Sequence, residues 1–201
     1  MNKNFRPLPV AAALALAATL ALPATANAQD WLVRVRAIDV VPNASSSLDG
    51  LDVKGQWAPE LDFSYFFTKN FAAELILATT RHEVTLNGNS LGKVSVLPPT
   101  LTLQYHFTEL GAFKPYVGAG LNLTWFYKND LKAGSVPLDV DSTSVGGAVQ
   151  AGLDYEFQKN WYFNLDYKYI WMSTDVKAAG ATLTNLKINP SVFGIGVGYR
   201  F

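Results

Sequence analysis

The most regular feature of the chain is a period-two alternation of apolar and polar residues. In the stretch from Trp161 to Trp171, apolar side chains occupy the odd-numbered positions, and Asn164, Asp166 and Lys168 occupy even ones. Because successive side chains of a β-strand point to opposite faces, this pattern predicts a strand with one apolar and one polar face. The same phase recurs and predicts eight strands, at about 31–41, 57–67, 71–81, 94–107, 114–127, 144–157, 161–173 and 186–201.

The connections between these strands alternate in length. Short turns are expected at 68–70, 108–113 and 158–160, and longer segments rich in Gly, Ser, Asn and Asp at 42–56, 82–93, 128–143 and 174–185. An even strand number with short turns on one side and long loops on the other is typical of a bacterial outer-membrane barrel. The sequence therefore predicts an all-β fold, an eight-stranded antiparallel transmembrane β-barrel with short periplasmic turns and four longer extracellular loops.

A secreted β-sandwich also has alternating strands, so the position of the aromatic residues matters. Aromatic side chains gather near the ends of the predicted strands: Trp31, Phe67, Phe71, Tyr105, Phe107, Trp125, Tyr127, Trp161, Trp171, Tyr199 and Phe201. Aromatic girdles at the two membrane interfaces have this placement, whereas a sandwich would find such side chains hard to bury. The barrel is therefore favoured.

Composition agrees with export. The chain is 49% hydrophobic and only 16% charged. Near its start, Lys3 and Arg6 precede an apolar run at 10–22 and the small-x-small site Ala26-Asn27-Ala28. This arrangement predicts a cleaved signal peptide at 1–28, because the run is too short to span a membrane, and leaves a single barrel domain at 29–201. Equal numbers of basic and acidic residues, 16 of each, indicate no nucleic-acid binding.

If odd-numbered residues face lipid, even-numbered residues line the interior. The charged residues predicted near the periplasmic end are Arg34, Arg36, Glu74, Asp154, Glu156, Asp166 and Arg200, and Asp62 and Lys168 are expected nearer the middle. Buried charges are tolerated only when they are paired, and an eight-stranded barrel is just wide enough to be filled by its side chains. These residues are therefore predicted to form a charged periplasmic plug, in preference to an aqueous ion pore.

The outer half of the predicted interior is apolar instead. Its residues are Ile38, Val40, Ile76, Ala78, Phe126, Ile170, Met172, Ile188 and Val192. Because barrel interiors are usually polar, this hydrophobic lumen suggests that apolar molecules enter from outside. Packing against the loops is the alternative. Loop residues that would complete either a cup or an inert cap are Leu48, Leu51, Val53, Leu131, Val136 and Leu138.

A closed lower end would require a captured molecule to leave sideways. Proline lacks the N–H that a strand ladder needs and is normally kept out of strand interiors. Pro98 and Pro99 lie within the fourth predicted strand. They are a candidate lateral opening between the third and fourth strands, with a simple register kink as the alternative.

Catalysis and metal binding have little support. The chain has two histidines and no cysteine. His106 is expected inside the plug, and His82 at a solvated outer rim without a serine partner. The sequence therefore predicts no enzyme, no cofactor and no metal site.

Three segments resemble the OmpW/AlkL family of small outer-membrane proteins: LPPTLTLQYHF (97–107), KPYVGAGLNLTWF (114–126) and INPSVFGIGVGYRF (188–201). The resemblance implies an eight-stranded barrel linked to passage of small hydrophobic molecules across the outer membrane of a Gram-negative bacterium. The family usually has a proline after strand three, where this chain has Thr80. Tyr199 and Phe201 resemble the C-terminal signature recognised by the barrel-assembly machinery.

Two functions are consistent with this pattern. The first is passive uptake of small hydrophobic molecules, which enter the apolar upper lumen and leave laterally into the bilayer. The second is a non-transporting barrel that acts as a structural anchor, adhesin or phage or toxin receptor through its loops. The expected partners are outer-membrane lipid and lipopolysaccharide, small hydrophobic solutes and, during biogenesis, the barrel-assembly machinery.

Overall fold

The computed structural model describes residues 30–201, so the predicted signal peptide lies outside the described residues. The strands are β1 (Trp31–Val41), β2 (Leu51–Val53), β3 (Gln56–Phe66), β4 (Phe71–Ala78), β5 (Thr80–Leu86), β6 (Asn89–Leu97), β7 (Thr100–His106), β8 (Phe113–Tyr127), β9 (Lys132–Ala133), β10 (Val136–Val140), β11 (Thr143–Gln158), β12 (Trp161–Ile170), β13 (Ser173–Ala178), β14 (Ala181–Lys187) and β15 (Ser191–Arg200). Within this part of the chain, no helix is long and apolar enough to cross a membrane.

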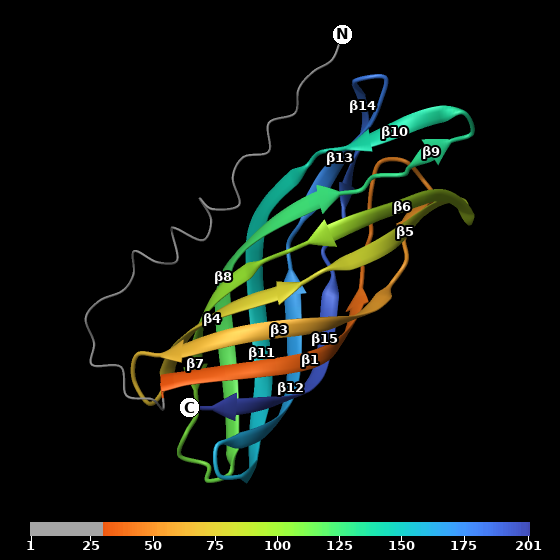
Figure 1. The fold of residues 1–201 in the computed structure, drawn as a ribbon. Helices are drawn as coiled ribbons and strands as arrows, with labels where there is room; N and C mark the ends of the chain where they lie inside the picture. Colours follow the sequence, from red (N-terminus) through yellow and green to blue (C-terminus); the bar gives the residue numbers. More distant parts are fainter. Residues whose placement is uncertain (1–29) are drawn as a thin grey trace.

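Eight of these strands close into an antiparallel barrel, as predicted. Around the wall the order is β1, β3, β4, β7, β8, β11, β12 and β15, and β15 pairs again with β1. Closure matters in lipid, because an open strand edge would leave backbone groups without hydrogen-bond partners. Figure 1 shows β1 and β15 side by side. In Figure 1 the hairpins β5–β6 and β13–β14 extend beyond the end of the barrel that lies away from the C-terminus.

The extracellular connections are more regular than the sequence analysis expected. The segment 82–93 belongs mostly to the β5–β6 hairpin, and 174–185 to the β13–β14 hairpin. Asn87 and Gly88 have φ angles of 50° and 80°, and Ala179 and Gly180 have 49° and 84°. Two consecutive positive φ angles are typical of the tight turns that join hairpin strands. The Asn-Gly pair in the sequence is therefore a turn signal inside what was predicted as a loop.

The predicted alternation between lipid and interior is confirmed. Odd-numbered Leu121 and Val145 are 70% and 76% exposed on the outer surface, whereas even-numbered residues of the same strands point inward. The interior is so narrow that glycine is required where large side chains lie. A Cβ atom at Gly152 would be 2.3 Å from the ring of Tyr116, and one at Gly196 would be 2.8 Å from Cγ of Arg36. These glycines make room for the interior side chains described below.

Candidate functional site: an apolar cavity above a charged network

The periplasmic half of the interior is organised around Arg34 of β1. Its Nε and Nη2 donate hydrogen bonds to the two carboxylate oxygens of Asp154, at 3.0 and 2.7 Å. Its Nη1 donates to Asp62 at 2.9 Å and to Glu74 at 3.1 Å. The two-pronged contact with Asp154 uses the planar fork of the guanidinium, which makes ion pairs of this kind strong and directional. One buried side chain therefore links β1 to three other barrel strands.

Arg36 and Lys168 form the next level of the interior. Arg36 donates to Glu60 at 2.9 Å and to Glu74 at 3.1 Å. Lys168 donates to Oε1 of Glu60 at 2.8 Å and to Asp166 at 2.5 Å. We define the charged network as Arg34, Arg36, Glu60, Asp62, Glu74, Asp154, Asp166 and Lys168, all of which are at most 5% exposed.

Neutral polar side chains supply the remaining hydrogen bonds of this network. Tyr116 and Gln150 each donate to Oδ2 of Asp166 at 2.7 Å. Gln104 donates to Glu74 at 2.7 Å and also contacts His106, with 2.9 Å between Gln104 Oε1 and His106 Nε2. Charges removed from water are stable only when most of their hydrogen-bonding groups have partners, as they do here. The side chains that provide these bonds also fill the narrow barrel at this level.

Seven of the nine predicted plug residues belong to the charged network, and two do not. Glu156 pairs with Lys114 at 3.4 Å, and its side chain is 30% exposed. The prediction for Glu156 is wrong because this end of β11 carries a register shift and reaches the solvent-accessible rim. Arg200 places its guanidinium carbon 4.0 Å from the centre of the Phe66 ring. The analysis also missed Glu60, which the even-numbered phase of the second predicted strand would have identified.

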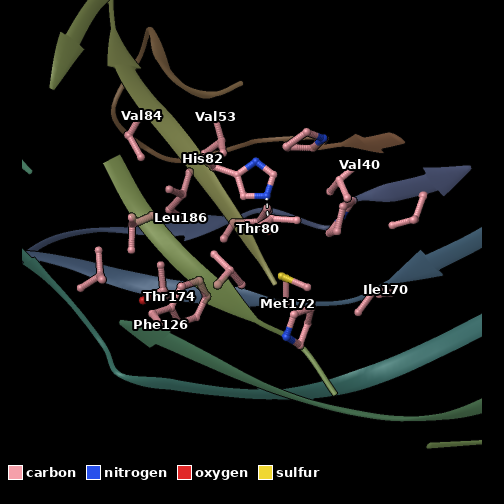
Figure 2. Close-up of a pocket in the computed structure, with 18 of the residues that line it drawn as sticks. Val40, Val53, Thr80, His82, Val84, Phe126, Ile170, Met172, Thr174 and Leu186 are labelled. Atoms are coloured by element: carbon pink, nitrogen blue, oxygen red, sulfur yellow. Dashed lines mark hydrogen bonds between the residues drawn. The ribbon is translucent and has the colours of Figure 1, made fainter. Parts of the chain in front are cut away.

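Above the charged network lies an apolar cavity. It contains about 970 Å³ free of protein atoms, counting the part that is open to solvent. All nine residues of the predicted hydrophobic lumen line it: Ile38, Val40, Ile76, Ala78, Phe126, Ile170, Met172, Ile188 and Val192. Leu51, Val53, Leu131 and Leu138 from the extracellular segments extend its wall. Leu48 and Val136 do not, since they are 41% and 48% exposed. Figure 2 shows these elements converging on one space.

Several polar side chains also line the cavity. Glu60 and Lys168 line it where it meets the charged network. At the extracellular end of the cavity, His82 of β5 is buried, so the expectation that it lies at a solvated rim is wrong. Its Nδ1 lies 2.8 Å from the carbonyl oxygen of Lys54 and its Nε2 lies 2.8 Å from Oγ1 of Thr80, beside which the ring lies in Figure 2. Burial lowers the pKa of His82 from its ordinary value. A neutral ring that donates through Nδ1 to the carbonyl fits both contacts.

The hydrogen-bond ladder of the barrel wall is interrupted beside the cavity, at Pro98 and Pro99, where a lateral opening was predicted. The β4–β7 ladder ends at the pair Ile76↔Thr100, and the pairing resumes in the same register at Thr80↔Val96 between β5 and β6. The backbone N–H of His106 donates to the carbonyl of Asn70. Since hydrogen-bonded pairs alternate with non-bonded ones, the hydrogen-bonded pairs of this ladder are the pairs of even-numbered residues. A donor is therefore missing where Pro98 faces β4. The carbonyl of Pro98 instead accepts hydrogen bonds from the side chains of Thr100 and Asn122.

A second interruption lies on the other side of the same chain segment. The β3–β4 pairing ends at Glu60↔Ala78, and Pro59 follows where the next ladder donor is expected. In the part of the chain that the structure describes, no backbone hydrogen bond involves Thr79. Its side chain contacts the Tyr127 hydroxyl at 2.6 Å. The wall at Thr79 therefore has no backbone ladder bonds, and Thr80 begins the resumed strand.

Taken together, a closed eight-stranded barrel, a lipid-facing apolar exterior and a two-part interior define a small outer-membrane β-barrel protein. The OmpW family model matches residues 27–201. The chain belongs to the OmpW family, and it is a protein of the outer membrane of a Gram-negative bacterium.

Comparisons with individual proteins agree. The chain is 47% identical to an uncharacterised outer-membrane protein of Sinorhizobium fredii, over 95% of this chain and 90% of the relative. It is 35% identical to outer membrane protein W of Vibrio cholerae, over 92% and 95%. The crystal structure of OprG from Pseudomonas aeruginosa is similar with a TM-score of 0.77 and 29% identity, over 85% of this chain and 95% of that one. A more distant relative, 28% identical over 90% of this chain and 93% of its own length, is a dibenzothiophene metabolism operon protein of Pseudomonas aeruginosa. The family consists of outer-membrane barrels rather than known enzymes.

Proposed function

We propose that this protein is an outer-membrane channel for passive uptake of small hydrophobic molecules. The observation that carries the proposal is the apolar cavity, which is lined by residues of every wall strand except β11 and by residues of the extracellular segments. An aqueous channel would instead present polar groups to its lumen. The relative named for a dibenzothiophene metabolism operon adds support, because dibenzothiophene is an apolar molecule.

We further propose that the captured molecule leaves sideways into the bilayer. The charged network fills the barrel below the cavity with hydrogen-bonded side chains, so a straight path would have to break several buried ion pairs. The wall beside the cavity lacks ladder bonds around Thr79 and Pro98, and Pro98 itself lines the cavity. Opening the wall there costs fewer hydrogen bonds than opening it anywhere along a continuous ladder.

Uptake of a hydrophobic solute by cells tests the channel. A deletion strain is expected to take up the solute more slowly, and the wild-type gene to restore the rate. Ile170→Asp places a charge in the apolar cavity and is expected to reduce uptake to the deletion level, because desolvating an unpaired carboxylate is costly. Ile170→Leu, which keeps the cavity apolar, is the matched control. Equal uptake with and without the protein would instead favour an anchor, adhesin or receptor role.

The same assay tests the lateral exit. The chain has no cysteine, so Thr79→Cys and Leu97→Cys can be joined specifically across the interrupted ladder. Cross-linking is expected to slow uptake, and reduction to restore it. Leu75→Cys with Leu101→Cys, a pair in the intact part of the same ladder, is the control. Undiminished uptake in the cross-linked 79–97 protein would contradict an exit at this place.

A further inference from the structure

The inner end of the apolar cavity holds a carboxylate oxygen without a hydrogen-bond partner. Glu60 is 3% exposed and lines the cavity. Both of its hydrogen bonds, from Arg36 at 2.9 Å and from Lys168 at 2.8 Å, reach the same oxygen, Oε1. Among the described residues, none donates a hydrogen bond to Oε2. The second oxygen of a buried carboxylate therefore remains available beside an apolar space.

An oxygen in this position is unusual. Buried polar atoms almost always have a partner, and a charged one left without a donor is costly. Each of the other carboxylates of the charged network accepts at least one hydrogen bond from an arginine, glutamine or tyrosine side chain; Asp166, for example, accepts bonds from Tyr116, Gln150 and Lys168. Among the described residues, Oδ2 of Asp62 is a buried oxygen without a hydrogen bond, but it lies 2.8 Å from Nη1 of Arg36 in an ion pair. Glu60 differs because it is the carboxylate that borders the cavity. The missing donor is therefore expected to come from whatever occupies the cavity.

The charge balance restricts what that occupant is. The charged network contains three cations, Arg34, Arg36 and Lys168, and five carboxylates, Glu60, Asp62, Glu74, Asp154 and Asp166, a formal charge of 3 − 5 = −2 when all are ionised. Lys168, the cation that borders the cavity, already donates to two carboxylates. A molecule ending in a carboxylate would meet repulsion here, whereas one ending in a hydrogen-bond donor would satisfy Oε2.

We propose that the cavity preferentially binds elongated apolar molecules that end in a hydrogen-bond donor, such as a primary alcohol, with the donor directed to Oε2 of Glu60. The rest of the molecule would extend toward Ile170 and Phe126 through the apolar part of the cavity. This inference rests on the proposed function, since it names the class of molecule that the same cavity takes up.

Binding to the purified full-length mature protein tests the preference. An apolar fluorescent probe is displaced by 1-octanol, by its methyl ether, which lacks the donor, by octane and by octanoate. A hydrogen bond to a charged acceptor favours octanol over the ether roughly tenfold or more, and octanoate is expected to bind more weakly than octanol. Equal displacement by octanol and ether overturns the inference, because the ligand then donates no hydrogen bond to Oε2 and water takes that place. The proposed function would remain intact. No displacement by any of the four compounds contradicts both.

A variant links the preference to Glu60. Glu60→Gln keeps the side-chain volume and removes the charge, so the preference for octanol over the ether is expected to fall to about threefold or less. Glu156→Gln, which changes a carboxylate outside the network and the cavity, is expected to keep the wild-type preference. Folding of both is checked by resistance of the barrel to detergent denaturation. A folded Glu60→Gln protein with the full wild-type preference would overturn the assignment, and if this variant fails to fold, the comparison of ligands on the wild-type protein still decides.

Discussion

The two halves of the barrel interior differ in how their side chains occupy the space: charged groups fill the lower half, and apolar groups line a cavity in the upper half. Strand β1 passes through both. Above Leu32 at the periplasmic end, its inward-facing residues run from Arg34 and Arg36 in the charged network to Ile38 and Val40 at the cavity. Charged side chains need several partners at about 3 Å, so they converge and fill the space around them. Apolar side chains have no directional requirement and can line a space that remains partly empty. One half of the barrel is therefore suited to closure and the other to binding.

Removing the centre of the charged network should have the largest effect on stability. Arg34→Met leaves Asp62, Asp154 and Glu74 without their shared buried partner, which is expected to lower the free energy of unfolding by about 3–5 kcal/mol. Denaturant unfolding of the barrel in lipid vesicles measures this value. A loss below about 1 kcal/mol would show that the network tolerates an unpaired carboxylate and would weaken the contrast between the two halves.

A truncation in the apolar half should cost less. Ile38→Ala removes a side chain four positions after Arg34 on the same strand. The expected loss of unfolding free energy is about 2 kcal/mol, at the low end for buried isoleucine, because the side chain already borders free space. The same unfolding measurement applies. A loss as large as that of Arg34→Met would mean that the cavity wall is packed as tightly as a protein core.

The smallest effect is expected at an ion pair outside the membrane. Lys69 and Glu109 lie in two periplasmic turns, 2.7 Å apart and largely exposed. The hydrogen bond from Lys69 lowers the pKa of Glu109. The pair is therefore present above the ordinary carboxyl pKa and is lost as pH falls through the lowered value. Lys69→Gln should raise the pKa of Glu109 in an NMR titration with no measurable change in overall stability. A clear loss of stability would show that exposed pairs also hold this barrel together.

Much of the fold could be predicted from the sequence, because a strand with one lipid face and one interior face must alternate. The phase of that alternation distinguished lipid-facing residues such as Leu121 from interior residues such as Asp62. It also separated a charged level from an apolar level, since height along a strand follows directly from residue number. The hairpins were missed because Asn87-Gly88 was treated as part of a loop rather than as a turn.

Only the tertiary structure decided which interior groups meet. Residues far apart in the chain, such as Arg34 and Asp154, become partners only when the barrel closes and brings β11 opposite β1. The same is true, in the part of the chain that the structure describes, of positions without a hydrogen-bond partner, such as Oε2 of Glu60 and the backbone of Thr79. Alternation along a strand is a local property, whereas hydrogen-bond satisfaction depends on every strand around the wall. The sequence by itself therefore determined which face of the sheet each residue occupies. The closed barrel determined which interior groups have hydrogen-bond partners within the protein and which remain available to a bound molecule.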